Sequence, residues 1–348
     1  MDEHKRRVHY SGKYPKKFEE KYKEQNPEKY KDTVEHVIKK GSTPAGMHIS
    51  IMVNEILEAL DIKPGENGLD CTLGYGGHTK AMLEKLQGKG HIVGLDVDPI
   101  ESVKTVDRLR NAGFSEDIFS MKLINFAKID KVAEEFGKFD FILADLGVSS
   151  MQIDDPKRGF SYKIDGPLDL RLDPTSGISA AERLKELDFD ELVGMFVENS
   201  DEPYAEEIAE KIIRRNKSDK PIERTTDLRE VIESALVRVP KEERAEAVKK
   251  SCARVFQALR IDVNQEFEVL YELLDKLPQV LNPGGRVAIL TFHSGEDRLV
   301  KKSFKNFCKE GVYESITEDA IRPSMEECVR NPRAKSTKLR YAVKNREM

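Results

Sequence analysis

The stretch that decides the fold is Leu69-Asp70-Cys71-Thr72-Leu73-Gly74-Tyr75-Gly76-Gly77-His78-Thr79. It lies between an apolar run, Gly68 to Cys71, and a helical pattern that starts near Lys80. Glycines at such a turn let the backbone approach a ligand closely, and the first turn of the following helix offers free N–H groups. The stretch predicts a binding turn at the end of a strand, although a purely structural turn can have the same glycines.

Further apolar runs are typical of buried strands, and stretches of helical periodicity separate them. They are His91 to Leu95, Phe139 to Ala144 and Arg286 to Phe292. Strands that alternate with helices predict a mostly parallel sheet in an α/β protein. We therefore expect a Rossmann-like core.

The strand signal disappears between about residues 175 and 254, where the chain becomes charged and helix-periodic. This change predicts a helical subdomain inserted into the core. We divide the chain into a basic N-terminal arm (1–46), a first core segment (47–174), the helical insert (175–254), and a second core segment with the C-terminal tail (255–348).

The composition favours a soluble, cytoplasmic protein with no membrane partner. The 348 residues are 39% hydrophobic and carry a net charge of −5, and no apolar run approaches the roughly 18 residues of a membrane span. The four cysteines lack framework or metal-ligand spacing, so we predict no metal site. The arm, with twelve basic and eight acidic side chains and interleaved tyrosines, suits either RNA binding or a solvated tail.

Asp96 ends the second strand run and lies twenty residues beyond Gly76. An acidic side chain there can accept hydrogen bonds from both ribose hydroxyls of a nucleoside cofactor, and a helix cap is the alternative role. The glycines read G-x-G-G-H rather than the G-x-G-x-x-G of a dinucleotide site, and Asp70 suits a positively charged sulfonium. The pattern favours S-adenosylmethionine over a nicotinamide cofactor, and hence a class I methyltransferase core over a dehydrogenase.

Asp145 ends the strand run Phe139 to Ala144 and opens the turn Asp145-Leu146-Gly147-Val148-Ser149-Ser150. Ligands of open parallel sheets bind beyond the carboxyl ends of the strands, so this turn faces the same crevice as Asp96. It can contact cofactor and substrate together.

Several longer motifs identify the chain as similar to the bacterial MraW family, the ribosomal small-subunit methyltransferase H enzymes, over about residues 47–343. Besides Asp145–Ser150, they are Asp154-Asp155-Pro156-Lys157-Arg158-Gly159-Phe160-Ser161, Asp165-Gly166-Pro167-Leu168-Asp169-Leu170-Arg171, Phe256-Gln257-Ala258-Leu259-Arg260-Ile261, Phe292-His293-Ser294-Gly295-Glu296-Asp297-Arg298 and Asn331-Pro332-Arg333.

The resemblance implies methylation of the N4 amine of a cytidine in small-subunit ribosomal RNA, either naked or in the assembled subunit. It also implies that the helical insert helps to form an RNA cleft, and a homodimer is a further option. The family's cofactor contacts fall on Gly76, Gly77, His78, Asp96, Phe126, Asp145 and Gln152.

The substrate contacts are hypotheses from the same motifs. Asp145 is the candidate acceptor for the hydrogens of the cytosine amine, with a role towards the cofactor alone as the alternative. Arg158, Phe160 and Arg171 are candidate clamps for an unstacked base, and His293 is a candidate RNA contact. For each of these four, a structural role is the alternative.

Cys71, Tyr75 and Gly295 depart from the family pattern, and the long arm is additional. These departures suggest a divergent branch or a paralogue. The alternative functions are therefore a noncatalytic RNA-binding assembly factor and a methyltransferase that acts on another RNA, a protein or a small molecule.

Overall fold

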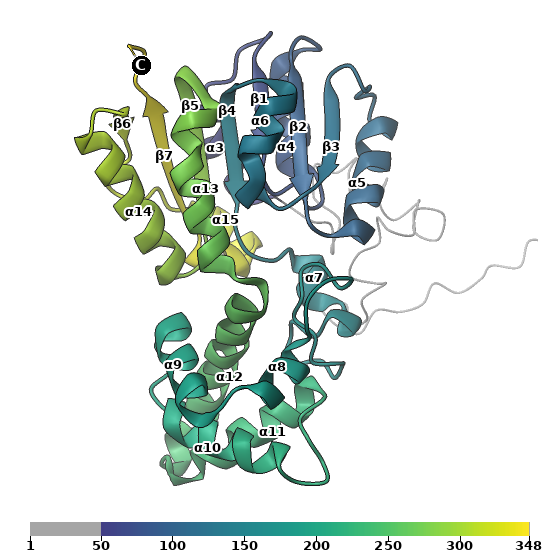
Figure 1. The fold of residues 1–348 in the computed structure, drawn as a ribbon, viewed down its shortest axis with the longest axis vertical. Helices are drawn as coiled ribbons and strands as arrows, with labels where there is room; N and C mark the ends of the chain where they lie inside the picture. Colours follow the sequence, from purple (N-terminus) through teal and green to yellow (C-terminus); the bar gives the residue numbers. More distant parts are fainter. Residues whose placement is uncertain (1–49, 348) are drawn as a thin grey trace, which may run out of the picture. The chain divides into compact units, whose positions relative to one another are not determined.

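The computed structural model describes residues 50–347, and the predicted basic arm lies outside them. The sheet, its covering helices and a separate group of helices are drawn in Figure 1. Within residues 50–347, no helix has both the length and the apolar character needed to cross a bilayer.

A seven-stranded sheet has the order β3-β2-β1-β4-β5-β7-β6. Strands β1 to β5 pair in parallel, whereas β7 pairs antiparallel with both β5 and β6. The strands are β1 (Asn67–Asp70), β2 (His91–Asp96), β3 (Phe119–Leu123), β4 (Phe139–Asp145), β5 (Leu281–Thr291), β6 (Tyr313–Ile316) and β7 (Lys338–Lys344). The order reverses direction between β1 and β4, which is where doubly wound sheets open a ligand crevice.

Helices cover both faces of the sheet, as the continuous apolar runs require. Ile142 and Ala144 of β4 belong to one apolar cluster, and Phe141 and Leu143 belong to the other. The first cluster also contains residues of α6 (Ile129–Phe136), α13 (Glu266–Val280) and α14 (Ser294–Lys309). The second also contains residues of α3 (Val53–Leu60), α4 (Gly77–Leu86) and α5 (Pro99–Asn111). The predicted Rossmann-like fold is confirmed.

Five helices form a group with an apolar core of their own (Figure 1). They are α8 (Ala180–Glu186), α9 (Phe189–Ser200), α10 (Ala205–Asn216), α11 (Thr225–Ala235) and α12 (Lys241–Asn264). The same core includes Phe160, Leu168 and Leu170, which precede the helices in sequence. The proposed boundary between residues 254 and 255 lies within α12, which leads directly into α13.

Short helical elements lie in the connections between the longer helices and strands. They are α7 (Ser150–Asp154), α15 (Met325–Arg330) and the 3-10 helices η2 (Phe126–Lys128), η3 (Pro156–Arg158), η4 (Leu236–Arg238) and η5 (Pro332–Ser336). The arginine of η5, Arg333, pairs with Asp154 of α7 at 2.9 Å, so the C-terminal segment is fastened to the loop that follows β4.

Candidate active site

The glycine turn joins β1 to α4 as the sequence predicted. Gly76 has a φ of 81° and precedes α4 directly. A Cβ atom on Gly76 would lie 2.7 Å from Cγ2 of Thr105. The position therefore requires glycine both for its left-handed backbone and for the close approach of α5.

Asp70 stabilises this turn from inside. It is buried, and its two carboxylate oxygens accept hydrogen bonds from the Thr79 hydroxyl at 2.6 Å and the Thr72 N–H at 3.0 Å. Burial raises the pKa of Asp70, and these hydrogen bonds oppose the rise. Both oxygens accept hydrogen bonds from residues that flank the glycines, so Asp70 stabilises the conformation of the loop.

Asp96 lies at the carboxyl end of β2 and faces the glycine turn. Its Oδ2 accepts from the Gly74 N–H at 2.9 Å and its Oδ1 from the Asp98 N–H at 2.8 Å. Burial raises its pKa to about 6, against the effect of these backbone hydrogen bonds. The helix-cap alternative falls instead on Asp98, whose side chain accepts from the N–H groups of Ile100 and Glu101. Asp96 is therefore not needed as a cap.

Asp145 and His78 meet between β4 and α4. The Asp145 N–H donates to the Thr72 hydroxyl at 2.7 Å, and its Oδ2 lies 3.4 Å from Nδ1 of His78. Among residues 50–347, no group donates a hydrogen bond to the buried Oδ1 of Asp145. A buried carboxylate oxygen without a donor is unusual, and it indicates a position for a donor on a ligand.

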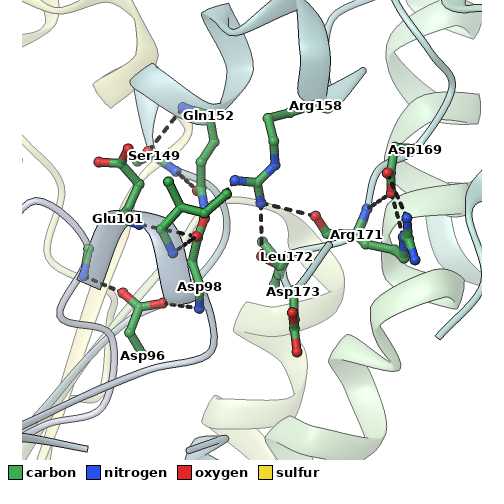
Figure 2. A network of polar contacts seen from close by, with 12 residues as sticks. Asp96, Asp98, Glu101, Ser149, Gln152, Arg158, Asp169, Arg171, Leu172 and Asp173 are labelled. Carbon is green, nitrogen blue, oxygen red and sulfur yellow. Dashed lines mark hydrogen bonds and ion pairs between the residues drawn. The ribbon is translucent and has the colours of Figure 1, made fainter. Parts of the chain in front are cut away.

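Phe126 lies in the connection after β3, and Gln152 lies in the connection after β4. Phe126 begins η2, which is capped by Asn125, and packs half-buried against the sheet. Gln152 forms a capping box with Ser149 at the start of α7, and its Nε2 donates to Asp98 Oδ2 at 3.2 Å. Figure 2 shows Gln152, Asp98 and Asp96 in one network of polar contacts.

The three candidate clamps have structural contacts in this conformation. Arg158 is buried and pairs with Asp98 at 2.6 Å, while Phe160 lies in the apolar core of the helical group. Arg171 forms two hydrogen bonds with Asp169, at 2.7 and 2.9 Å (Figure 2). These contacts favour their structural roles, and the substrate contacts stay predictions.

His293 follows β5 and caps α14. Its Nε2 lies 3.2 Å from Glu296 Oε1, and its ring meets Phe267 edge-on. Glu266, His293 and Glu296 have the spacing of a metal-ligand group, but both oxygens of Glu266 are bound by Arg260. The positive charge of the Arg260 guanidinium would repel a metal ion at these three residues.

Sequence reasoning missed Asp98 and Thr72 as parts of the site. Asp98 followed by Pro99 carries a readable signal, since an acidic cap before a proline in the first turn is typical of a helix start. Thr72 has no such signal, because its hydroxyl bonds a residue 73 positions away.

These features together fit a nucleoside cofactor with a charged sulfonium. The glycine turn leads into the first turn of α4, Asp96 faces it from the carboxyl end of β2, and Asp145 retains a free buried oxygen near the turn. An open parallel sheet with this arrangement at the carboxyl ends of β1, β2 and β4 defines a class I methyltransferase.

The chain belongs to the MraW methylase family, whose model matches residues 45–345. The match begins at residue 45, within the last two residues of the predicted arm. Family membership confirms the predicted class and, with it, S-adenosylmethionine as the cofactor.

Three relatives differ in how much of the chain they match. The chain is 66% identical to ribosomal RNA small subunit methyltransferase H 1 of Agathobacter rectalis, over 98% of both chains. It is 59% identical to ribosomal RNA small subunit methyltransferase H 2 of Alkaliphilus metalliredigens, over 99% of this chain and 100% of the relative. Identity to ribosomal RNA small subunit methyltransferase H of Clostridioides difficile is 39%, over 85% of this chain and 98% of the relative.

Proposed function

We propose that this protein methylates the N4 amine of a cytidine in small-subunit ribosomal RNA. The observation that carries the proposal is the free, buried Oδ1 of Asp145 at the carboxyl end of β4. The names of the relatives, each a ribosomal RNA small subunit methyltransferase H, support the substrate class.

The exocyclic amine of cytosine is a weak nucleophile because its lone pair is delocalised into the ring. A carboxylate that accepts one N4–H hydrogen bond turns the amine and increases its electron density. Oδ1 of Asp145 is available for this hydrogen bond, and Thr72 holds the backbone of Asp145 in place.

The His78 ring holds the Asp145 carboxylate from the side of α4. Its Nε2 faces the carbonyl of Ile51 at 2.9 Å and therefore donates, so a favourable contact between Nδ1 and Asp145 needs a second ring proton. Burial acts to lower the pKa of His78, but the hydrogen bond and charge of Asp145 outweigh it and raise the pKa. A proton on Nδ1 makes the contact with Oδ2 of Asp145 a hydrogen bond and leaves Oδ1 open to a donor on the substrate.

The reaction needs little more from the protein than alignment and a proton acceptor. S-adenosylmethionine supplies an electrophilic methyl group on a positively charged sulfur. As the N4–methyl bond forms, the sulfur–methyl bond would break with its electron pair left on sulfur, giving S-adenosylhomocysteine, and Asp145 would accept the proton that N4 loses. Asp96 orients the cofactor through its ribose hydroxyls.

The test is methyl transfer from S-adenosylmethionine with a radioactive methyl group to small ribosomal subunits from cells that lack the enzyme. The RNA is then digested to nucleosides and separated. The expected result is label in N4-methylcytidine, and the same assay with naked ribosomal RNA identifies the assembly state of the substrate.

Three outcomes would overturn the proposal. Label in another nucleoside would change the reaction, and label in a protein fraction would change the substrate class. Cofactor binding with no label in either subunit or in RNA would favour the noncatalytic assembly factor.

A further inference from the structure

One carboxylate oxygen receives donors from two different segments of the chain. Asp98 Oδ2 accepts from Gln152 Nε2 at 3.2 Å and from Arg158 Nη1 at 2.6 Å (Figure 2). The side chains of Asp98 and Arg158 are 1% and 10% exposed, so water does not compete for this contact. The turn after β2 is thus joined to the loop after β4.

The other nitrogen of the Arg158 fork points to a third segment. Nη2 donates to the backbone carbonyls of Arg171 and Leu172, at 3.1 and 2.8 Å. Figure 2 shows the guanidinium between Asp98 on one side and these carbonyls on the other. A planar guanidinium can hold both sides at once, whereas the single ammonium of lysine cannot match this fork.

The segment that Arg158 holds is also fastened to the helical insert. Asn264, at the end of α12, accepts from the Leu172 N–H at 2.7 Å and donates to the Leu170 carbonyl at 2.8 Å. A continuous set of hydrogen bonds therefore runs from the turn after β2, through Arg158 and the segment 170–172, to α12.

The same set reaches the predicted cofactor acceptor. The Asp98 N–H donates to Asp96 Oδ1, and Gln152, a predicted cofactor contact, shares Asp98 Oδ2 with Arg158. A change in the position of Asp98 on cofactor binding would move one fixed end of the Arg158 fork. Breaking a buried ion pair is costly, so both ends move together.

We propose that Arg158 is a positioning residue that couples the cofactor turn to the segment 170–172, so that cofactor and RNA each strengthen the binding of the other. This inference rests on the proposed function for the identity of the RNA, and on the predicted RNA cleft beside the helical insert for its contact with this segment. Coupling between two sites is reciprocal, so either ligand can report it.

The experiment measures the affinity of S-adenosylhomocysteine, the unreactive product, with and without small ribosomal subunits. Equilibrium dialysis with labelled S-adenosylhomocysteine gives both dissociation constants, and their ratio is the coupling. For the unaltered protein we expect at least about fivefold tighter binding with saturating subunits. For Arg158→Met we expect a ratio below about twofold, and for Arg158→Lys an intermediate ratio.

A matched control is Arg183→Met. Arg183 of α8 pairs with Asp262 of α12 at 2.8 Å, within the helical group and away from Asp98. This variant loses an arginine–aspartate pair whose side chains are 33% and 21% exposed, against 10% and 1% for Arg158 and Asp98, and should retain the full ratio. An equal drop in both variants would show that general destabilisation, and not coupling, reduces the ratio.

If Arg158→Met does not fold, Asp98→Asn takes its place. Its remaining oxygen can still cap α5 through Ile100 and Glu101, but its amide cannot accept from Arg158. Unchanged coupling in a folded Asp98→Asn or Arg158→Met protein would overturn the inference, as would a ratio near one in the unaltered protein. Methyl labelling of RNA by the unaltered protein separates either result from failure of the proposed function.

Discussion

Nδ1 of His78 lies 3.4 Å from Oδ2 of Asp145, while Nε2 of the same ring faces the Ile51 carbonyl at 2.9 Å. Because the carbonyl fixes Nε2 as a donor, the proton on Nδ1 decides whether the contact with Asp145 is attractive. This contact holds Oδ2 of the carboxylate whose Oδ1, at the carboxyl end of β4, is buried and receives no donor from residues 50–347.

Asp145→Asn should reduce the rate of methyl transfer much more than it reduces cofactor affinity. The amide lacks the negative charge that accepts the N4 proton, so we expect a loss of about 100-fold or more in the single-turnover rate. Affinity for S-adenosylhomocysteine should change by less than about tenfold. A comparable loss in the single-turnover rate and in the affinity for S-adenosylhomocysteine would mean that Asp145 contacts the cofactor alone. Thr72→Val, which keeps Oδ1 of Asp145, is the control and should have the smaller effect.

Cofactor affinity should fall as the pH decreases through the range of Asp96. Its pKa of about 6 means that most of the side chain is ionised at pH 7 and roughly a tenth at pH 5. If only the carboxylate accepts both ribose hydroxyls, affinity for S-adenosylhomocysteine falls about tenfold between these values, as calorimetry can measure. Asp96→Asn should bind weakly with a flat profile, and a persistent pH dependence in that variant would assign the titration to another group.

The raised pKa of Asp96 affects the stability of the unliganded protein in the opposite direction: the stability falls as the pH increases, whereas cofactor affinity rises. A carboxyl whose pKa is raised on folding stabilises the fold below its unfolded pKa, and this contribution is lost as the pH rises through about 6. We therefore compare the free energy of unfolding of the unliganded Asp96→Asn variant with that of the unaltered protein by urea unfolding. The difference, variant minus unaltered protein, should be larger at pH 8 than at pH 4.

Gly76→Ala should lower the free energy of unfolding through two separable effects. The left-handed backbone costs a β-carbon about 1–2 kcal/mol, and the new methyl would also contact the Thr105 methyl. Gly65→Ala is the control, because Gly65 has a φ of 96° and open space around it. This variant measures the cost of the left-handed backbone without a new contact. Adding Thr105→Ser, which removes that methyl and keeps the hydroxyl bonded to Gly74, should recover part of the loss. No recovery would mean that the contact with Thr105 contributes nothing.

Asp297→Asn should destabilise the antiparallel edge of the sheet. Asp297 on α14 accepts from Arg340 and Lys338 of β7, both at 2.7 Å, and the variant leaves a buried guanidinium without its counter-ion. We expect a loss of about 3 kcal/mol in urea unfolding at pH 7. The exposed pair of Glu326 and Arg330 provides the control, since Glu326→Gln should have little effect.

The pH dependence of this loss follows from the pKa of Asp297. Burial acts to raise that pKa, but Arg340 and Lys338 outweigh burial and lower it. The stabilising contribution is therefore present above the unfolded pKa and lost as the pH falls through the lower folded value. The difference between Asp297→Asn and the unaltered protein should shrink in acid, and a constant difference would contradict this origin.

The central strands were predictable because both of their faces are buried, which leaves continuous apolar runs such as Phe139 to Ala144. Strand β7 was not, because buried charged residues interrupt its apolar pattern. Asp297 neutralises Arg340, and the carbonyls of Pro278 and Leu281 accept from Lys344, so partners far away in the sequence permit the burial of these charges.

The site likewise contains residues that were predictable from local sequence and contacts between distant segments that were not. The glycine turn and Asp96 are local features at the ends of strands, and their positions follow from the order of elements. The pairing of Arg158 with Asp98 spans 60 residues and depends on how the loop after β4 folds back. The pairing of Asp154 with Arg333 likewise joins segments that are far apart in the sequence.

The placement of the helical insert between β4 and β5 affects the newly synthesised chain. These strands are neighbours in the sheet, but residues 146–280 separate them in sequence. At roughly 5–20 residues per second, β4 emerges about 7–27 s before its partner β5. During that interval the apolar hydrogen-bonding edge of β4 is open to wrong partners. We expect the nascent protein to depend on chaperones in this interval more than a methyltransferase of equal size whose strands are synthesised without an insertion.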